Sequence, residues 1–143
     1  MNLLQHTITE VSHLIPQKEP FVMVDSLVFF SETKIVSNFT ITLDNIFLKE
    51  TVFTESGIIE NMAQTVALHT GYDFFRRDEQ PPTGYIGAIK KVNLYGLPKL
   101  GETITTEAII LQEFMGVTMV SVKVVNLDGE ELATSEMKTV IAN

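Results

Sequence analysis

The longest helical pattern in the chain covers residues 55–77. Apolar side chains recur there at intervals of three and four residues and surround most of the helix: Ile58, Ile59, Met62, Ala63, Val66 and Leu68. No proline interrupts the stretch, and Thr54 or Ser56 can cap its start. A helix that is apolar around most of its circumference must be covered by other elements, so we expect it at the centre of the fold.

Most of the remaining chain shows the alternation or the β-branched and aromatic runs that are typical of strands. The expected strands span residues 21–30, 35–43, 85–95, 103–114, 118–126 and 131–142, and a short helix is expected over residues 7–14. This order predicts a single α+β domain over residues 1–143, an antiparallel sheet of about six strands wrapped around one long central helix.

One face of the predicted helix differs from the rest. At about 100° per residue, Gly57, Gln64, Ala67 and Gly71 all lie within about 60° of Glu60. Small side chains let another backbone or a thin ligand approach closely, and a carboxylate among them would be partly desolvated and suited to proton transfer. The alternative is a solvent-facing Glu60 with Gln64 as its neighbour on the helix surface.

Composition excludes several classes of function. The 143 residues include no Cys, so disulfides and thiolate chemistry are excluded, and the three His are not spaced as metal ligands. A net charge of −8 argues against nucleic acid as a partner. No stretch of 18 apolar residues and no signal-peptide pattern occurs, so we expect a cytoplasmic protein with no membrane contact.

Four segments resemble, in order, motifs of the bacterial 3-hydroxyacyl-acyl-carrier-protein dehydratases. They are residues 15–25 (Ile-Pro-Gln-Lys-Glu-Pro-Phe, then an apolar run ending in Asp), 58–64 (with Glu-Asn-Met-Ala-Gln), 86–92 and 97–102. The similarity extends from about residue 14 to residue 141. This resemblance implies the hot-dog fold, in which a sheet wraps around the long helix, and a dimer with sites at its interface.

The resemblance also implies a site. Glu60 occupies the position of the catalytic carboxylate, which assists departure of the 3-hydroxyl as a general acid, and we assign Gln64 an orienting role beside it. The expected substrate-binding residues are Gly57 and Ala67 on the small-residue face, Ile58 next to Gly57, and Gly87 and Ala88 on the glycine-containing strand. No cofactor is expected, because the acyl substrate is carried as a phosphopantetheine thioester on acyl carrier protein or coenzyme A.

This sequence lacks the other catalytic residue of the family, a His in a His-Phe-Pro-Gly segment before the helix. No His lies between His13 and His69, and Ile46 falls in the expected position. His69 follows Glu60 by nine residues, about 900° along a helix, and therefore faces the opposite side. His13 could approach Glu60 only if the N-terminal segment folded over the site.

Acyl carrier proteins are acidic, so docking on this acidic chain would need a local basic patch. The candidates are Arg76, Arg77, Lys90 and Lys91, and ordinary solvated positions are the alternative for both pairs.

Three functions remain open. The first is dehydration of a 3-hydroxyacyl thioester by Glu60 in fatty acid biosynthesis or in a specialised acyl or polyene pathway. The second is thioester hydrolysis by Glu60 alone. The third is a non-catalytic subunit that pairs with a His-bearing homologue, as a heterodimer instead of a homodimer or higher oligomer.

Overall fold

The computed structural model describes residues 1–142. Its main sheet contains β1 (Ser26–Phe30), β2 (Lys34–Thr40), β5 (Gly84–Leu94), β6 (Thr103–Phe114), β7 (Val117–Asn126) and β8 (Glu131–Ile141). These six strands are antiparallel and lie in the order β1-β2-β6-β7-β8-β5. A small hairpin of β3 (Leu48–Lys49) and β4 (Val52–Phe53) precedes the helix α1 (Glu55–Arg76).

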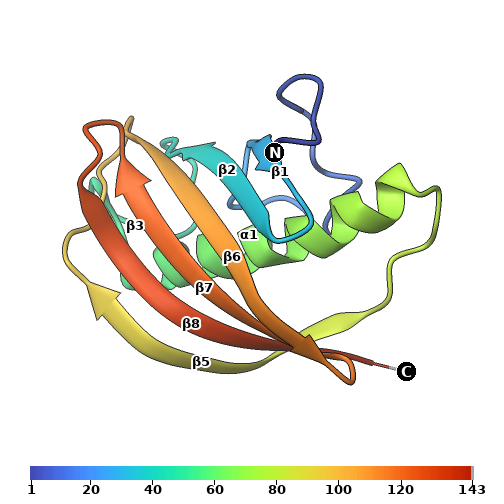
Figure 1. Cartoon of the computed structure of the whole chain (residues 1–143). Coiled ribbons are helices and arrows are strands. Elements are labelled where there is room, and N and C mark those ends of the chain that lie inside the picture. The colour runs from blue at the N-terminus through green and yellow to red at the C-terminus, as the bar shows by residue number, and fades with distance from the viewer. Residues whose placement is uncertain (143) are drawn as a thin grey trace.

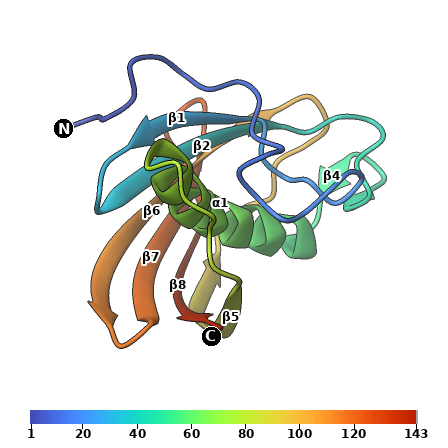
Figure 2. The same ribbon diagram turned by 90° about the vertical axis from the view of Figure 1, so that its right-hand side faces the viewer.

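The sheet curves around α1, which confirms the predicted hot-dog architecture (Figures 1 and 2). Side chains of the helix and of the concave sheet face form one core in which the most deeply buried residues are large and apolar: Phe30, Ile35, Ile58, Met62, Leu68, Ile104 and Met137. Burying a side chain of this size stabilises the fold by about 1.5–3 kcal/mol relative to its exposure. The helix is therefore held mainly by packing against the sheet.

The prediction of a short helix over residues 7–14 is wrong. Ile8 instead pairs with Leu27 of β1, and each residue donates its N–H to the carbonyl of the other at 2.9 and 2.8 Å. A turn follows, in which the Leu14 N–H donates to the Val11 carbonyl. The helical spacing of apolar residues arises because Val11 and Leu14 enter the core from this turn, and the backbone bonds to β1 exclude a helix at Ile8.

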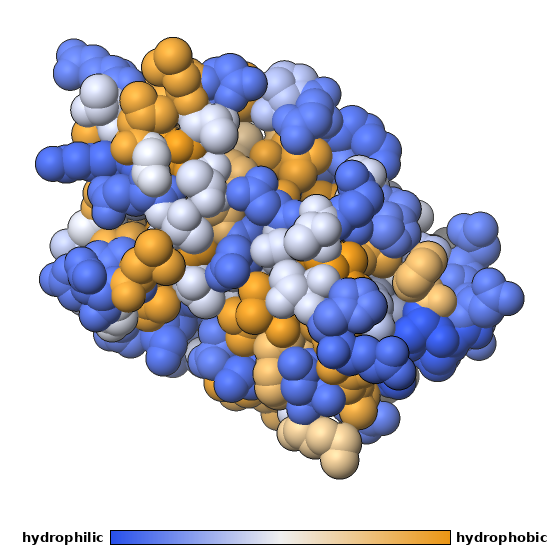
Figure 3. All heavy atoms as spheres, turned by 90° about the horizontal axis from the view of Figure 1, so that it is seen from above, coloured by the Kyte–Doolittle hydropathy of each residue, from blue (hydrophilic) through white to orange (hydrophobic). Residues whose placement is uncertain are grey.

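The outer surface carries no large continuous apolar area on the side seen in Figure 3, where apolar side chains form separate groups among hydrophilic ones. The edge strand β5 is different. Ten of its 11 residues are exposed, and they include Tyr85, Ile86, Ile89, Val92 and Leu94. An edge strand that exposes apolar side chains is a surface that proteins normally protect.

Gly71 allows the N-terminal segment to cross α1. A Cβ placed on Gly71 would lie 1.8 Å from the carbonyl oxygen of Leu14, which is far inside van der Waals contact. The small-residue face of the helix thus permits close approach of another backbone at this position, as its composition suggests.

We therefore expect Gly71→Ala to destabilise the protein by about 1–3 kcal/mol, the range for overpacking a close contact. The same change in an unobstructed helix would stabilise it by about 1 kcal/mol. A loss of stability would therefore show that the Leu14 backbone packs closely on Gly71. Urea denaturation measures the difference, and Thr70→Ala on the same turn is the control. A Gly71→Ala protein as stable as wild type would show that Leu14 does not pack on the helix in this way.

Candidate active site

Two helix side chains hold the backbone of Met23. The Met23 N–H donates to Gln64 Oε1 at 2.7 Å, and Asn61 Nδ2 donates to the Met23 carbonyl at 2.6 Å. Asn61 and Gln64 are three residues apart, so they project from adjacent turns of the same helix face. The segment 21–25 was predicted as the first part of a strand, but β1 begins only at Ser26, because side chains of α1 take the place of a neighbouring strand.

The same glutamine contacts Glu60. Gln64 Nε2 donates to the Phe21 carbonyl at 2.8 Å and to Glu60 Oε1 at 2.9 Å. Because the Met23 N–H can only donate, Gln64 must present its oxygen there and its amide hydrogens to Phe21 and Glu60. The carboxylate of the half-buried Glu60 therefore has one oxygen, Oε1, held by a fixed donor.

A buried polar network continues from Asn61 toward the sheet. Thr106 Oγ1 of β6 donates to Asn61 Oδ1 at 2.6 Å, and Thr65 Oγ1 donates to the Asn61 carbonyl at 2.9 Å. Ser37 of β2 bonds to Thr65 at 2.7 Å. All four side chains are completely buried. This network was not predicted from the sequence, although polar residues at positions 61, 64 and 65 of a mainly apolar helix were a signal for it.

Asp25 is the last residue of the segment that crosses α1 before β1 begins. Its carboxylate accepts the Thr40 N–H of β2 at 2.7 Å, and the Asp25 N–H donates to the Asn38 carbonyl. Burial raises the pKa of Asp25, and the bond from Thr40 opposes that shift. The contact attaches the segment to β2 immediately after its bonds to the helix.

Most of the predicted substrate-binding residues on α1 pack against other residues of the same chain. Gly57 packs against Phe53 and Phe47, since a Cβ there would lie 2.5 Å from the Phe53 ring, and Ile58 is completely buried in the core. Ala67 is half-buried beside the same core. The structure brings Glu60 and Gln64 together, and the substrate-binding role of the other three stays a prediction.

Gly87 and Ala88 lie on β5. The register of β5 against β8 shifts between Ile86 and Ala88, so Gly87 occupies a bulge, where a Cβ would lie 3.1 Å from Val140 Cγ2. The neighbour that approaches Gly87 within this chain is thus the adjacent strand, and its role toward substrate stays a prediction.

His69 and His13 contact groups other than Glu60. His69 is 9% exposed, stacks on Phe30 with ring centroids 4.8 Å apart, and has Nε2 2.8 Å from the Ser31 carbonyl. His13 packs edge-on against Phe75 near the C-terminal end of α1. Within residues 1–142 no His forms a hydrogen bond with Glu60.

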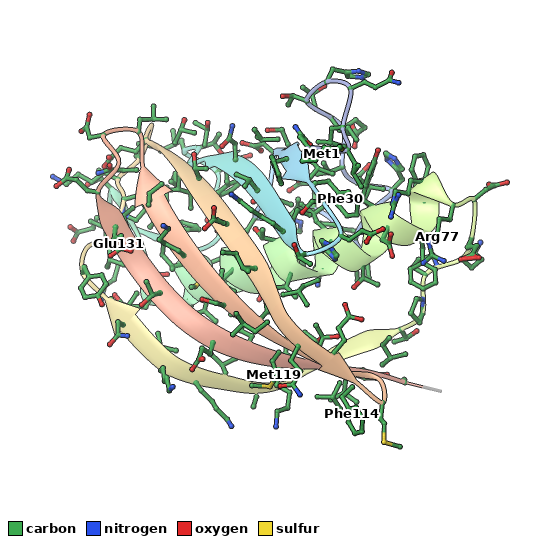
Figure 4. The ribbon with its side chains drawn as sticks, viewed as in Figure 1. Met1, Phe30, Arg77, Phe114, Met119 and Glu131 are labelled. Atoms are coloured by element: carbon green, nitrogen blue, oxygen red, sulfur yellow. The ribbon has the colours of Figure 1, made fainter. Side chains whose placement is uncertain are left out.

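The predicted docking residues form two separate groups. Arg76 and Arg77, at the C-terminal end of α1, both pair with Asp73, at 2.9 and 3.1 Å (Figure 4 labels Arg77). On β5, Lys91 pairs with Glu136 at 2.9 Å, whereas Lys90 makes no ion pair within the described part of the chain. The role of these cations in carrier docking stays a prediction.

Among residues 1–142, no group of three or more His, Asp or Glu side chains is arranged to hold a metal ion. No helix of the same residues is long and apolar enough to cross a bilayer.

The class and the family follow from comparison with known proteins. A model of the ApeP-like family, described as ApeP dehydratase, matches residues 9–141. The chain therefore belongs to the ApeP-like family of hot-dog dehydratases. No curated protein matches it.

Several solved structures share its fold. The dehydratase heterocomplex ApeI:P from Xenorhabdus doucetiae matches with a TM-score of 0.83 and 19% identity over 93% of this chain and 91% of that one. The smu.793 protein from Streptococcus mutans, bound to acetyl-CoA, gives a TM-score of 0.70 and 15% identity over 90% and 96%. The PaaI protein of the E. coli phenylacetic acid degradation operon gives 0.65 and 14% over 80% of each.

We expect Gln64→Ala to lower the free energy of unfolding by about 2 kcal/mol or more, because it leaves the Met23 N–H buried without an acceptor. Urea denaturation provides the measurement. Gln80→Ala, at an exposed linker position, should change stability by less than about 0.5 kcal/mol. Equal stability of the two variants would mean that Gln64 does not hold the segment over α1.

The stability of the protein should depend on pH through the protonation of His69. Burial lowers its pKa below the ordinary value of 6.5, against the opposing effects of its bond to Ser31 and of Asp73 and Glu113. As the pH falls through about 6.5, the unfolded chain gains a proton that the folded chain does not, so the free energy of unfolding falls.

The slope from this one group cannot exceed about 1.4 kcal/mol per pH unit. Denaturation between about pH 7.5 and pH 5 should show a shallower slope in His69→Gln, which keeps a donor for Ser31. The two proteins should have the same slope above about pH 7.5. Identical slopes in the acidic range would contradict this account of His69.

Proposed function

We propose that this chain is one subunit of a 3-hydroxyacyl thioester dehydratase, in which it supplies Glu60 and a His-bearing homologue supplies the general base. The observation that carries the proposal is the bond from Gln64 to Glu60, which has no hydrogen bond to a His among residues 1–142. A subunit with a purely structural role has no chemical need for a carboxylate held in this way.

The reaction needs two proton transfers. A base removes the proton from C2 of the acyl chain, and an acid protonates the departing 3-hydroxyl, which leaves as water as the C2–C3 double bond forms. Gln64 occupies Oε1 of Glu60 and leaves the other oxygen, Oε2, for contact with the substrate. We assign Glu60 the role of general acid from the resemblance to the dehydratases, and the base then comes from another group.

A partner subunit is the natural source of that base. The ApeI:P structure, which shares the fold of this chain, is described as a dehydratase heterocomplex, and this supports assembly of two different chains. Family membership adds to the support, because the ApeP-like family is named for a component of that complex.

The exposed edge of β5 is the surface that we assign to this partner. β5 pairs with β8 on one side and is the last strand of the sheet, so its other edge has unpaired backbone groups. Exposed Ile86, Ile89 and Val92 add apolar area beside that edge. An added strand from a partner would pair the backbone groups and cover these side chains.

We also propose which molecule carries the acyl group. Acyl carrier protein is the carrier that the dehydratase resemblance suggests, and the acetyl-CoA bound to smu.793 shows that the same fold can bind a coenzyme A thioester. Lys90 is the candidate docking cation that has no ion pair within residues 1–142.

Hydrolysis of an acyl thioester is the second candidate. It is favoured by one observation: Glu60 accepts a hydrogen bond from Gln64 and has none to a His among residues 1–142. A single carboxylate can act as base or nucleophile in hydrolysis. Release of free thiol by this chain alone, without enoyl product, would support it.

We expect co-expression with a His-bearing homologue from the same organism to give a mixed complex with dehydratase activity. Glu60→Gln in that complex should lower the rate at least about a hundredfold, because it removes the transferable proton and keeps the side-chain volume. Formation of enoyl thioester measures the rate, and urea denaturation checks stability.

Glu55→Gln is the matched control, since Glu55 is an exposed carboxylate in the first turn of the same helix. It should retain activity within about twofold of wild type. If Glu60→Gln also stays within about threefold of wild type, Glu60 takes no part in the reaction and the subunit is structural.

A further inference from the structure

A second site lies at the other end of the helix. A cavity of about 370 Å³ separates the C-terminal half of α1 from the ends of β6, β7 and β8. Helix and strands diverge toward this end of the molecule (Figure 1). Val66 lines the cavity and follows Glu60 by six residues, or about 600°, which places it on a different side of α1. Neither Glu60 nor Gln64 lines the cavity.

The floor of the cavity is apolar. Ile35, Ala108 and Val120 line it although each is at most 2% exposed, and Val66 and Ile110 extend the same surface. The rim of the cavity is polar and charged, so the cavity combines an apolar surface with polar groups, as small-molecule sites do.

His69 contributes to the cavity a ring nitrogen that accepts no hydrogen bond from residues 1–142. Its Nε2 must donate to the Ser31 carbonyl, because a carbonyl oxygen only accepts. Burial keeps the pKa of His69 below its ordinary value, so the ring is neutral near pH 7 and its Nδ1 is an acceptor. Nδ1 makes no hydrogen bond within residues 1–142, although His69 is only 9% exposed and lines the cavity.

The charges around the cavity do not favour an anion. Arg76 and Arg77 line it, but both pair with Asp73, and Glu32 and Glu113 add further negative charge. Phosphate-bearing ligands need unpaired cations, which this surface does not offer. An uncharged ligand experiences no such penalty.

We propose that this cavity binds a small, uncharged, mainly apolar molecule with a hydroxyl group, and that the hydroxyl donates to His69 Nδ1. The apolar part of the ligand occupies the floor formed by Ile35, Ala108 and Val120. This site is separate from Glu60 and does not depend on the proposed dehydratase activity.

The probe is 4-propylphenol, and its methyl ether, 4-propylanisole, is the matched ligand without a donor. We expect NMR titration of the full chain to show saturable binding of the phenol with a dissociation constant on the order of 1 mM, as fits so small a ligand. The side-chain resonances of His69 should shift on binding. The ether should bind at least about fivefold more weakly, because it leaves Nδ1 unsatisfied.

Two variants on β7 locate the site. Thr118 lines the cavity, so Thr118→Phe should obstruct it and weaken phenol binding at least about tenfold. Met119 is the next residue and faces the other side of the sheet, so Met119→Phe should bind within about twofold of wild type. Met119 is labelled in Figure 4. Aromatic residues suit strands, so both substitutions are compatible with β7.

The absence of saturable binding up to about 10 mM would overturn the proposal, as would equal affinity for the phenol and the ether. Binding that leaves the His69 resonances unchanged would also overturn it. The comparison of ligands uses the wild-type protein, so it decides the question even if Thr118→Phe fails to fold. Equal binding by the two β7 variants would place the ligand elsewhere.

Discussion

The hydrogen bonds between the Met23 backbone and the side chains of Asn61 and Gln64 are the constraint on which the site depends. They fix the N-terminal segment across α1 at 2.6 and 2.7 Å, and they fix the orientation of the Gln64 amide. That orientation leaves an amide hydrogen for Glu60. The fold thus determines which group Glu60 contacts before any substrate arrives.

The same interaction connects helix and sheet. Asn61 bonds to Met23 with its amide hydrogens and accepts from Thr106 of β6 with its oxygen, so one buried side chain joins three parts of the chain. Polar groups buried this completely are stabilising only when they are paired, because an unpaired one costs about 1–3 kcal/mol. The network therefore specifies a single position of α1 relative to β6 and to the N-terminal segment.

The two halves of the helix carry different functional groups, Glu60 and His69. Near its start, Glu60 accepts a hydrogen bond from Gln64 and has none to a His among residues 1–142, which is the physical reason for proposing a partner subunit. Near its end, His69 lines the cavity, and its Nδ1 accepts no hydrogen bond from residues 1–142. The two groups lie on different sides of α1, so substitutions can test the two proposals separately.

The sequence by itself determined the elements whose patterns are local. The helix ends at Arg76, within one residue of its predicted end, and β6 covers residues 103–114 as expected, because helix and strand periodicities are set by neighbouring residues. The pairing of Glu60 with Gln64 could also be predicted from the sequence, since side chains four residues apart lie on the same face of a helix.

Only the tertiary structure decided how the N-terminal segment is held. Apolar spacing predicted a helix at residues 7–14 and a strand from residue 21, but distant partners satisfy both backbones. Ile8 pairs with Leu27, and Met23 bonds to a side chain 41 residues away. The periodicity of a segment records which residues become buried, whereas the partner that satisfies its N–H and C=O groups is fixed only when the chain has folded.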